Sequence, residues 1–334
     1  MKNIRIISLL FLLVLLASVA RAGDKKAVAL GDNHALVLKT DGTLWAFGRN
    51  SYGQLGDGTE NWQKTPVKIM DNVVQISAQD NKSMALKADG TLWTWGENDY
   101  GSLGDGTRDE HSTPKKIMDN VMSACVGDQQ SFAVDRDGWL WAWGNNSHGQ
   151  LGDGTTTDHY TPVRIMSGAK DVTGGAGTAF VVCQDGSLYQ LSPGLKSPRK
   201  IMEGVVKASC YGPYMALRRD GTLWTWGYNG SGELGDGTTE SRYDPSEAYK
   251  IMSGVTDFSS GYRHAMAVRK DGTLWAWGWN NYGQLGNGTT TGTLRPIQID
   301  DNVSSVSCGY AISAWITRDG ELRVVGKPFY EGDR

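Results

Sequence analysis

The feature that most restricts the fold of this chain is a short motif that recurs seven times at a nearly constant spacing. Each copy begins with an Asp-Gly dipeptide, and most continue much as in "DGTLWAWG" (271–278). The aspartates are Asp41, Asp89, Asp137, Asp185, Asp220, Asp271 and Asp319, at intervals of 48, 48, 48, 35, 51 and 48 residues. Self-similarity at a fixed period indicates a repeat architecture, in which each unit is one small supersecondary structure.

One complete unit, residues 66–114, predicts short strands and no helix. Its apolar segments are "PVKIM" (66–70), "VVQISA" (73–78), "SMALKA" (83–88) and "TLWTWG" (91–96). Asp-Gly between alternating apolar runs is a strong signal for a hairpin. We therefore predict an all-β fold, a seven-bladed β-propeller built from repeats of about 48 residues, with four short strands per blade and a truncated fourth repeat. Residues 23–334 are expected to form this single domain.

Paired aromatic residues in the last of these strands are expected to fill the space between blades. Trp93 and Trp95 are two residues apart, so on a strand they project from one face, while Leu92 and Thr94 project from the other. The corresponding pairs are Trp45/Phe47, Trp141/Trp143, Trp224/Trp226 and Trp275/Trp277. Because each large aromatic side chain buries roughly 150–250 Å², we expect these residues in the core rather than in a ligand site.

The first 22 residues are expected to be a signal peptide. Two basic residues precede an apolar run from Ile6 to Val19, and "ARA" (20–22) has the small-x-small pattern of a cleavage site. This run is shorter than a membrane span requires. We therefore expect a secreted, periplasmic or cell-surface protein with no membrane span in the mature chain.

The charge of the mature chain argues against nucleic-acid binding. Without the three basic residues of the signal, 30 Lys+Arg remain against 36 Asp+Glu, a net charge of 30 − 36 = −6. No basic cluster is present in the sequence, whereas attraction to nucleic acid needs clustered cations.

The four cysteines, Cys125, Cys183, Cys210 and Cys308, match no metal-binding spacing. We expect them to be small buried side chains on strands. Exported proteins also form disulfides. The repeat places Cys183 and Cys210 in adjacent blades, so these two are expected to bond if any pair does.

Three stretches resemble repeats of the regulator of chromosome condensation family: "GDNHALVLKTDG" (31–42), "NSYGQLGDGT" (50–59) and "DGTLWTWG" (89–96). The resemblance covers about residues 27–326 and implies a seven-bladed propeller. The founding member is a nuclear exchange factor for a small GTPase that acts through an inserted wedge and a basic tail. This chain has no interval longer than 51 residues and no basic tail. It looks more like the family's secreted bacterial branch, in which a propeller binds and inhibits β-lactamases through one loop-rich face.

These features together predict an exported, non-enzymatic module that binds a protein partner through its long loops. If "VVQISA" is the innermost strand, the loop after it and the loop after "LWTWG" lie on the same face. Aromatic, histidine and arginine side chains on loops held by a rigid scaffold are typical of binding surfaces. The candidate binding residues are Trp62, His111, His159, Tyr160, Arg242 and Tyr243 in the variable stretches, with Tyr52, Tyr100, His148, Tyr282, Tyr228 and Trp279 in or near the preceding turns.

Other functions remain open alternatives. Aromatic side chains on a rim also stack on sugar rings, so a carbohydrate-binding surface protein is the second hypothesis, and nucleotide exchange on a small GTPase is the third. No catalytic constellation stands out from the repeat, and no enzyme activity or cofactor is predicted. No metal is predicted either, because each "LGDGT" offers one carboxylate while calcium takes six or more oxygen ligands. His34 and His264 share one repeat position and are expected to be part of the scaffold.

Two repeats depart from the pattern. In the fourth, only six residues lead from Ser192 to Pro198, and Tyr189 and Leu191 replace the tryptophans. The short loop predicts either a notch in the rim that seats a partner or simple degeneration of one repeat. The seventh blade is predicted to lack its outer strand unless "KPFYEGDR" (327–334) supplies it, because the segment before "KAVAL" (26–30) falls in the signal peptide.

Overall fold

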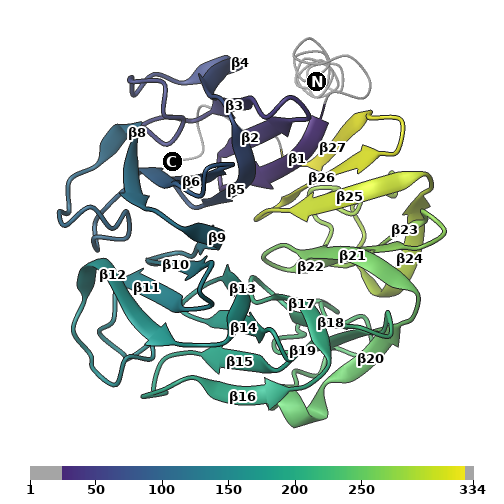
Figure 1. Ribbon diagram of the computed structural model, residues 1–334. Coiled ribbons are helices and arrows are strands. Elements are labelled where there is room, and N and C mark those ends of the chain that lie inside the picture. Colours follow the sequence, from purple (N-terminus) through teal and green to yellow (C-terminus); the bar gives the residue numbers. More distant parts are fainter. Residues whose placement is uncertain (1–24, 328–334) are drawn as a thin grey trace.

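The computed structural model describes residues 25–327, which form a ring of seven β-sheets (Figure 1). Blades 1 to 3 consist of β1 (Lys25–Leu30), β2 (His34–Lys39), β3 (Leu44–Gly48) and β4 (Gln63–Met70); β5 (Val73–Gln79), β6 (Lys82–Lys87), β7 (Leu92–Gly96) and β8 (His111–Met118); and β9 (Val121–Val126), β10 (Gln130–Asp135), β11 (Leu140–Gly144) and β12 (His159–Met166). Blades 4 and 5 consist of β13 (Ala169–Gly174), β14 (Ala179–Cys183), β15 (Leu188–Leu191) and β16 (Arg199–Met202); and β17 (Val205–Ser209), β18 (Tyr214–Arg218), β19 (Leu223–Trp226) and β20 (Tyr249–Met252). Blades 6 and 7 consist of β21 (Val255–Ser260), β22 (His264–Arg269), β23 (Leu274–Gly278) and β24 (Thr293–Asp300); and β25 (Val303–Cys308), β26 (Ile312–Thr317) and β27 (Leu322–Gly326). A short 3-10 helix, η1 (Pro245–Glu247), precedes β20.

Each blade is an antiparallel sheet whose strands follow one another in sequence order. The first strand of each blade is the innermost: β1, β5, β9, β13 and β17 contact one another in turn, and β25 contacts both β21 and β1 (Figure 1). The predicted seven-bladed propeller is therefore confirmed. The fourth repeat keeps all four strands, so its truncation is confined to the loop between β15 and β16. The expected signal peptide lies outside the described residues.

Tight turns reverse the chain at one end of the blades: an Asp-Gly pair within each blade, and an Asp-Asn pair between blades 1 and 2, 2 and 3, and 6 and 7. In the Asp-Gly turn of blade 1, Asp41 Oδ1 accepts the N–H of Thr43 at 2.9 Å, and Gly42 has a φ of 80°. The turn between blades 1 and 2 uses Asn72 at a φ of 63°, a conformation that asparagine tolerates better than most residues. These side chains explain why both dipeptides recur.

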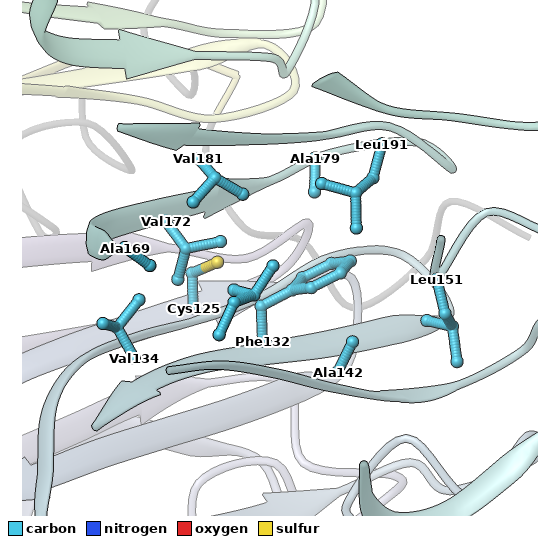
Figure 2. Close-up of a cluster of buried hydrophobic side chains, with 11 residues drawn as sticks. Cys125, Phe132, Val134, Ala142, Leu151, Ala169, Val172, Ala179, Val181 and Leu191 are labelled. Carbon is cyan, nitrogen blue, oxygen red and sulfur yellow. The ribbon is translucent and has the colours of Figure 1, made fainter. Parts of the chain in front are cut away.

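Apolar side chains from neighbouring blades interlock into a separate core at each seam. At the seam between blades 3 and 4, Phe132 and Val134 of β10 face Val172 and Val181 of the next blade (Figure 2). Such burial is the main force that holds one blade against the next. The structure thus has a succession of small cores rather than one large one.

The two faces of the third strand serve two different seams, as the sequence predicts. Trp95 of β7 packs with Leu36 and Leu38 of blade 1. Leu92 of the same strand packs with Val121 of blade 3. Alternation along a single strand therefore couples three consecutive blades.

The two tryptophans of each pair differ in burial. The inner members, Trp95, Trp143, Trp226 and Trp277, are fully buried. The outer members are half-buried, and the Nε1 of Trp93, for example, donates to Thr91 Oγ1 at 2.9 Å. The prediction of core packing is therefore met in full only by the inner members. The long loop of the preceding blade covers them, since a Cβ at Gly56 would lie 2.7 Å from Trp95 Nε1.

Inner tryptophans also bridge neighbouring blades by hydrogen bonds. The Nε1 groups donate as follows: Trp95 to Gln54 O at 2.9 Å, Trp143 to Ser102 O at 2.9 Å and Trp277 to Glu233 O at 2.8 Å. Each acceptor lies in the long loop of the preceding blade. Trp226 is equally buried, but its Nε1 has no partner within residues 25–327. The reason is the short loop of blade 4, which supplies no carbonyl at this place.

Within the described residues, blade 7 closes the ring against blade 1 by the packing of apolar side chains. Blade 7 contains three strands within the described residues, as predicted. Its seam with blade 1 is closed by side chains such as Ile312, Ile316 and Val324, which pack against Leu30 and Val37. Whether residues 328–334 add a strand lies outside the described residues.

The four cysteines are all free and buried. No disulfide joins Cys183 and Cys210. Cys210 Sγ instead donates to Thr178 O at 3.2 Å, and burial raises the pKa of Cys210 to about 12.

In residues 25–327 no helix is long and apolar enough to span a membrane.

His34 and His264 join adjacent blades from fully buried positions. His34 Nε2 lies 2.9 Å from Ser83 Oγ, and His264 Nε2 lies 2.7 Å from Ser313 Oγ. The Ser83 hydroxyl donates to Gln54 O, so His34 Nε2 must be the donor. Burial lowers the pKa of His34 to about 4 and that of His264 to about 3. These contacts support the predicted scaffold role.

The Trp143→Phe and Trp226→Phe variants are expected to differ in stability. Trp143→Phe leaves the Ser102 carbonyl without its indole donor, whereas Trp226→Phe removes a buried donor that has no acceptor. Since an unmet buried polar group costs about 1–3 kcal/mol, Trp226→Phe is expected to be at least about 1 kcal/mol less destabilising. Urea unfolding measures the difference, and equal losses would contradict the unmet donor at Trp226.

Stability is expected to fall with pH through the two buried histidines. Their pKa is about 6.5 when unfolded, so between pH 6.5 and about 4 the unfolded chain binds protons that the folded chain does not. The free energy of unfolding should drop by about 2 kcal/mol per histidine between pH 6 and 4.5. His34→Gln introduces the residue that blade 3 carries at the same position, Gln130, and should remove the part of this decrease that is due to His34. An unchanged dependence of the free energy of unfolding on pH in this variant would refute the mechanism.

Candidate binding face

One end of the ring carries all of the long loops. They follow the third strand of blades 1 to 6 and span 49–62, 97–110, 145–158, 192–198, 227–248 and 279–292. The short loops after the innermost strands emerge at the same end, because first and third strands of an antiparallel sheet run in the same direction. We call this end the long-loop face. The Asp-Gly and Asp-Asn turns lie at the opposite end.

A buried asparagine organises each long loop except that of blade 4. Asn98 is fully buried; its Oδ1 accepts the N–H of Leu103 at 2.9 Å, and its Nδ2 donates to Asp109 O at 2.9 Å. Asn50, Asn146, Asn229 and Asn280 bond in the same way to the leucine five residues later. An amide that is satisfied at both ends in a buried site fixes the path of the chain around it.

The aspartate of each "LGDGT" segment is a second anchor. In four blades it pairs with a residue six positions later: Asp57–Gln63 at 2.8 Å, Asp105–His111 at 2.6 Å, Asp153–His159 at 2.7 Å and Asp236–Arg242 at 3.1 Å. Burial raises the pKa of Asp153, but hydrogen bonds from Thr155, His159 and Asn146 outweigh it and hold the pKa at about 2. Three predicted site residues therefore close their own loops, and their part in binding stays a prediction.

The long loops are also fastened to the next blade. Gly106 N donates to Tyr160 O at 2.8 Å, and a Cβ at Gly101 would lie 2.3 Å from the Tyr160 ring. Tyr160 and His159 thus belong to the start of β12, and His111 to the start of β8, rather than to loops as expected. Their backbones pair with the preceding strand, as in Gly144 with His159, which extends the sheet.

The remaining predicted residues differ in exposure. The most exposed are Tyr243 at 67%, Tyr282 at 47% and Tyr228 at 42%. Tyr282 lies edge-on to Trp279, with ring centroids 5.3 Å apart. His148 is exposed, whereas Trp62, Tyr52, Tyr100 and Trp279 are half-buried. The structure places all of these side chains on the long-loop face, around its circumference rather than in one pocket.

The space left by the short loop of blade 4 is partly filled from blade 5. Tyr214 stands where Ser83 and Ser131 stand in their blades. Its ring lies 5.2 Å from Phe180 and 5.9 Å from Trp226, while η1 lies against β16. The notch predicted from the sequence is therefore narrowed by a compensating insertion.

The residues nearest the axis were not among the predicted site residues. The loops after the innermost strands carry Asp32, Asp80 and Asp128 in blades 1 to 3, and Tyr262 and Tyr310 in blades 6 and 7. These positions lie about 48 residues apart in sequence, and the variation among the seven copies was the signal available. Within residues 25–327 no three His, Cys, Asp or Glu side chains lie close enough to hold one metal ion.

The fold and this face define a β-propeller that presents its variable residues at one end. A family model described as "Regulator of chromosome condensation (RCC1) repeat" matches residues 41–86, 89–134, 137–182, 220–268 and 271–316. These matches cover more than half of the chain, which therefore belongs to this family, as the sequence motifs implied.

Known relatives show how widely this fold is used. The Arabidopsis thaliana ultraviolet-B receptor UVR8 is 31% identical over 118 residues, which are 34% of this chain and 27% of the receptor. Human WBSCR16 has a similar structure, with a TM-score of 0.77 at 20% identity over 93% of this chain and 88% of that one. Prp20p from Saccharomyces cerevisiae gives a TM-score of 0.73 at 22% identity, over 92% and 83%. The chain thus spans about a quarter of the receptor's length, and the two structures establish the fold alone.

Removal of a loop-organising asparagine is expected to destabilise the protein. In Asn98→Ala the Leu103 N–H and the Asp109 carbonyl lose their partner. The expected loss is about 3 kcal/mol of unfolding free energy, since each unmet buried group costs about 1–3 kcal/mol. Asn281→Ala, at an exposed site in another long loop, is the control and should change stability by less than about 0.5 kcal/mol. Equal effects, measured by urea unfolding, would show that Asn98 does not organise its loop.

Proposed function

We propose that this chain is an exported, non-enzymatic binding module that recognises a protein partner through its long-loop face. The observation that carries the proposal is the concentration of exposed tyrosines on that face. Tyr228, Tyr243 and Tyr282 are 42–67% exposed, and Tyr262 and Tyr310 add 41% and 42% near the axis. Tyrosine supplies a large contact area with little conformational freedom to lose, and it is enriched at protein interfaces.

The construction of the loops supports this function. The buried asparagines and the aspartate anchors hold the loop backbone, while the tyrosines project from it. A face of this kind binds with little rearrangement of its own chain. A relative of the same fold supports it further: the Prp20p structure is described together with its binding to Gsp1p and histones.

Loss of the exposed tyrosines is expected to abolish partner binding. Mature protein with Tyr228, Tyr243 and Tyr282 changed to Ala should recover at least about tenfold less partner from extracellular and envelope fractions of the source cells than wild type does, since aromatic residues carry much of the energy of an interface. Quantitative mass spectrometry of the captured proteins measures this. The exported state requires a mature N-terminus close to Gly23, read by N-terminal sequencing.

The matched control removes exposed apolar side chains from the other end of the ring. Val74 and Met122 are 41% and 43% exposed at the starts of β5 and β9, next to the Asp-Asn turns. Val74→Ala with Met122→Ala should recover the same protein as wild type. Undiminished recovery by the folded tyrosine variant, or equal loss in the control, would refute the assignment of this face.

A further inference from the structure

The loops that follow the innermost strands lie against one another around the axis of the ring on the long-loop face, and we call the area that they enclose the axial mouth. Asp32 N donates to Asp80 O at 3.2 Å, and Tyr262 N donates to Gly309 O at 3.2 Å. A Cβ at Gly309 would lie 3.7 Å from Gly31 O, so the loops of blades 7 and 1 are also neighbours. The residues that follow the innermost strands therefore stand side by side around the axis.

Three carboxylates gather on one side of this mouth, and we call Asp32, Asp80 and Asp128 the axial acidic cluster. Asp32 is repelled by Asp80, Asp80 by Asp128, and Asp128 by Asp32. Asp128 accepts one hydrogen bond, from Gln79 Nε2 at 3.0 Å. Asp32 and Asp80 form no ion pair within 4.0 Å in the described part of the chain. The pKa of Asp32 and that of Asp80 are each raised to about 6, first by removal from water and then by these repulsions.

One buried cation is directed into the cluster. Lys82 begins β6 and is 2% exposed; its backbone pairs with Gly96, and among residues 25–327 its Nζ forms no ion pair within 4.0 Å. Its ammonium interacts at longer range with Asp80, Glu97 and Asp128. Asp99 also acts on Lys82, and Asp80 acts on Asp32, so acidic side chains outnumber this lysine. Removal of charges from water normally requires close pairing, which this cluster lacks.

Aromatic rings complete the other side of the mouth. Tyr262 and Tyr310 are stacked, with centroids 4.7 Å apart and planes 18° apart, and both are exposed. The guanidinium of Arg263 lies 5.3 Å from the Tyr262 ring, so this pair already stacks on one arginine. Tyr211 of blade 5 interacts with Gln79 of blade 2 and with all three aspartates. The mouth thus has carboxylates on one side and tyrosine rings on the other.

We propose that this axial mouth receives an arginine side chain of the protein partner. A guanidinium offers five planar donors that match carboxylates and a flat cation that stacks on tyrosine. A metal ion does not fit, because no three carboxylates of the described chain close on a single point. The inference rests on the proposed function, since it names the group that a partner on this face would insert at the centre.

The test uses a small probe and therefore needs no partner. Acetyl-Gly-Arg-Gly-amide is titrated into 15N-labelled mature protein, with the citrulline peptide, which is neutral and nearly isosteric, as the matched ligand. The arginine peptide is expected to give saturable shifts at the amides of Asp32, Asp80 and Asp128, and the citrulline peptide is expected to give none. Equal binding of the two peptides, or shifts that map elsewhere, would overturn the proposal.

Two protein variants of equal charge show whether the cluster itself is responsible. Asp32→Asn/Asp80→Asn/Asp128→Asn should weaken the arginine peptide by at least about tenfold, because truncation of one member of a charge pair typically costs that much or more. Asp71→Asn/Asp119→Asn/Asp301→Asn removes the same charge from exposed turns at the other end of the ring and should change affinity by less than about twofold. An equal loss of peptide affinity in both variants would show that net charge, not the axial acidic cluster, is responsible. If the first variant does not fold, Asp80→Asn alone is compared with Asp119→Asn.

Three further outcomes test this inference and separate it from the function on which it rests. If Ca²⁺ or Mg²⁺ produces the same shifts as the peptide, the mouth is a metal site and the proposal fails. If wild type captures a partner that depends on the tyrosines but binds no arginine peptide, the inference fails while the proposed function stands. If the arginine peptide binds but the tyrosine variant loses no partner, the mouth is a cation site and the proposed function fails.

Discussion

The hydrogen bond from an inner tryptophan to a loop carbonyl of the preceding blade is the interaction on which both the ring and its binding face depend. The indole ring fills the seam, and its Nε1 holds the loop that leaves the neighbouring blade. In blade 2 the same carbonyl, that of Gln54, also receives the Ser83 hydroxyl, which in turn binds His34. The same side chain therefore packs the core and positions the loop, so a blade cannot shift without moving the loop beside it.

The sequence was sufficient for the scaffold because the scaffold is periodic. The interval of about 48 residues, the Asp-Gly hairpins and the two-residue alternation of Trp93 and Trp95 each specify local geometry that the structure reproduces. The absence of a fourth strand in blade 7, within the residues that the structure describes, also followed from counting repeats. Periodicity within one repeat does not show which ring of each pair the loop of the preceding blade covers, so the partial exposure of the outer tryptophans was not foreseen.

The candidate site was harder to predict because its members meet only after the chain turns back or the ring closes. Asp153 and His159 are six residues apart, and only the reversed loop brings them to 2.7 Å. His159 was predicted to be a binding residue because its position varies among the copies. Part of that variation arises because the equivalent aspartate pairs with different kinds of side chain in different blades. Asp32 and Asp128 lie in blades 1 and 3 and repel each other on one side of the mouth, which no pattern within one repeat indicates.

The loop architecture has an energetic consequence for recognition. Each residue of a flexible loop that becomes ordered costs about 1–2 kcal/mol in lost backbone freedom. In this propeller that ordering is part of folding, because Asn98 and its counterparts bind the loop backbone from within the protein. Contact with a second molecule would then add only the immobilisation of surface side chains. Because the exposed tyrosines are not among these buried anchors, substitution of their rings alters the surface without loss of the fold.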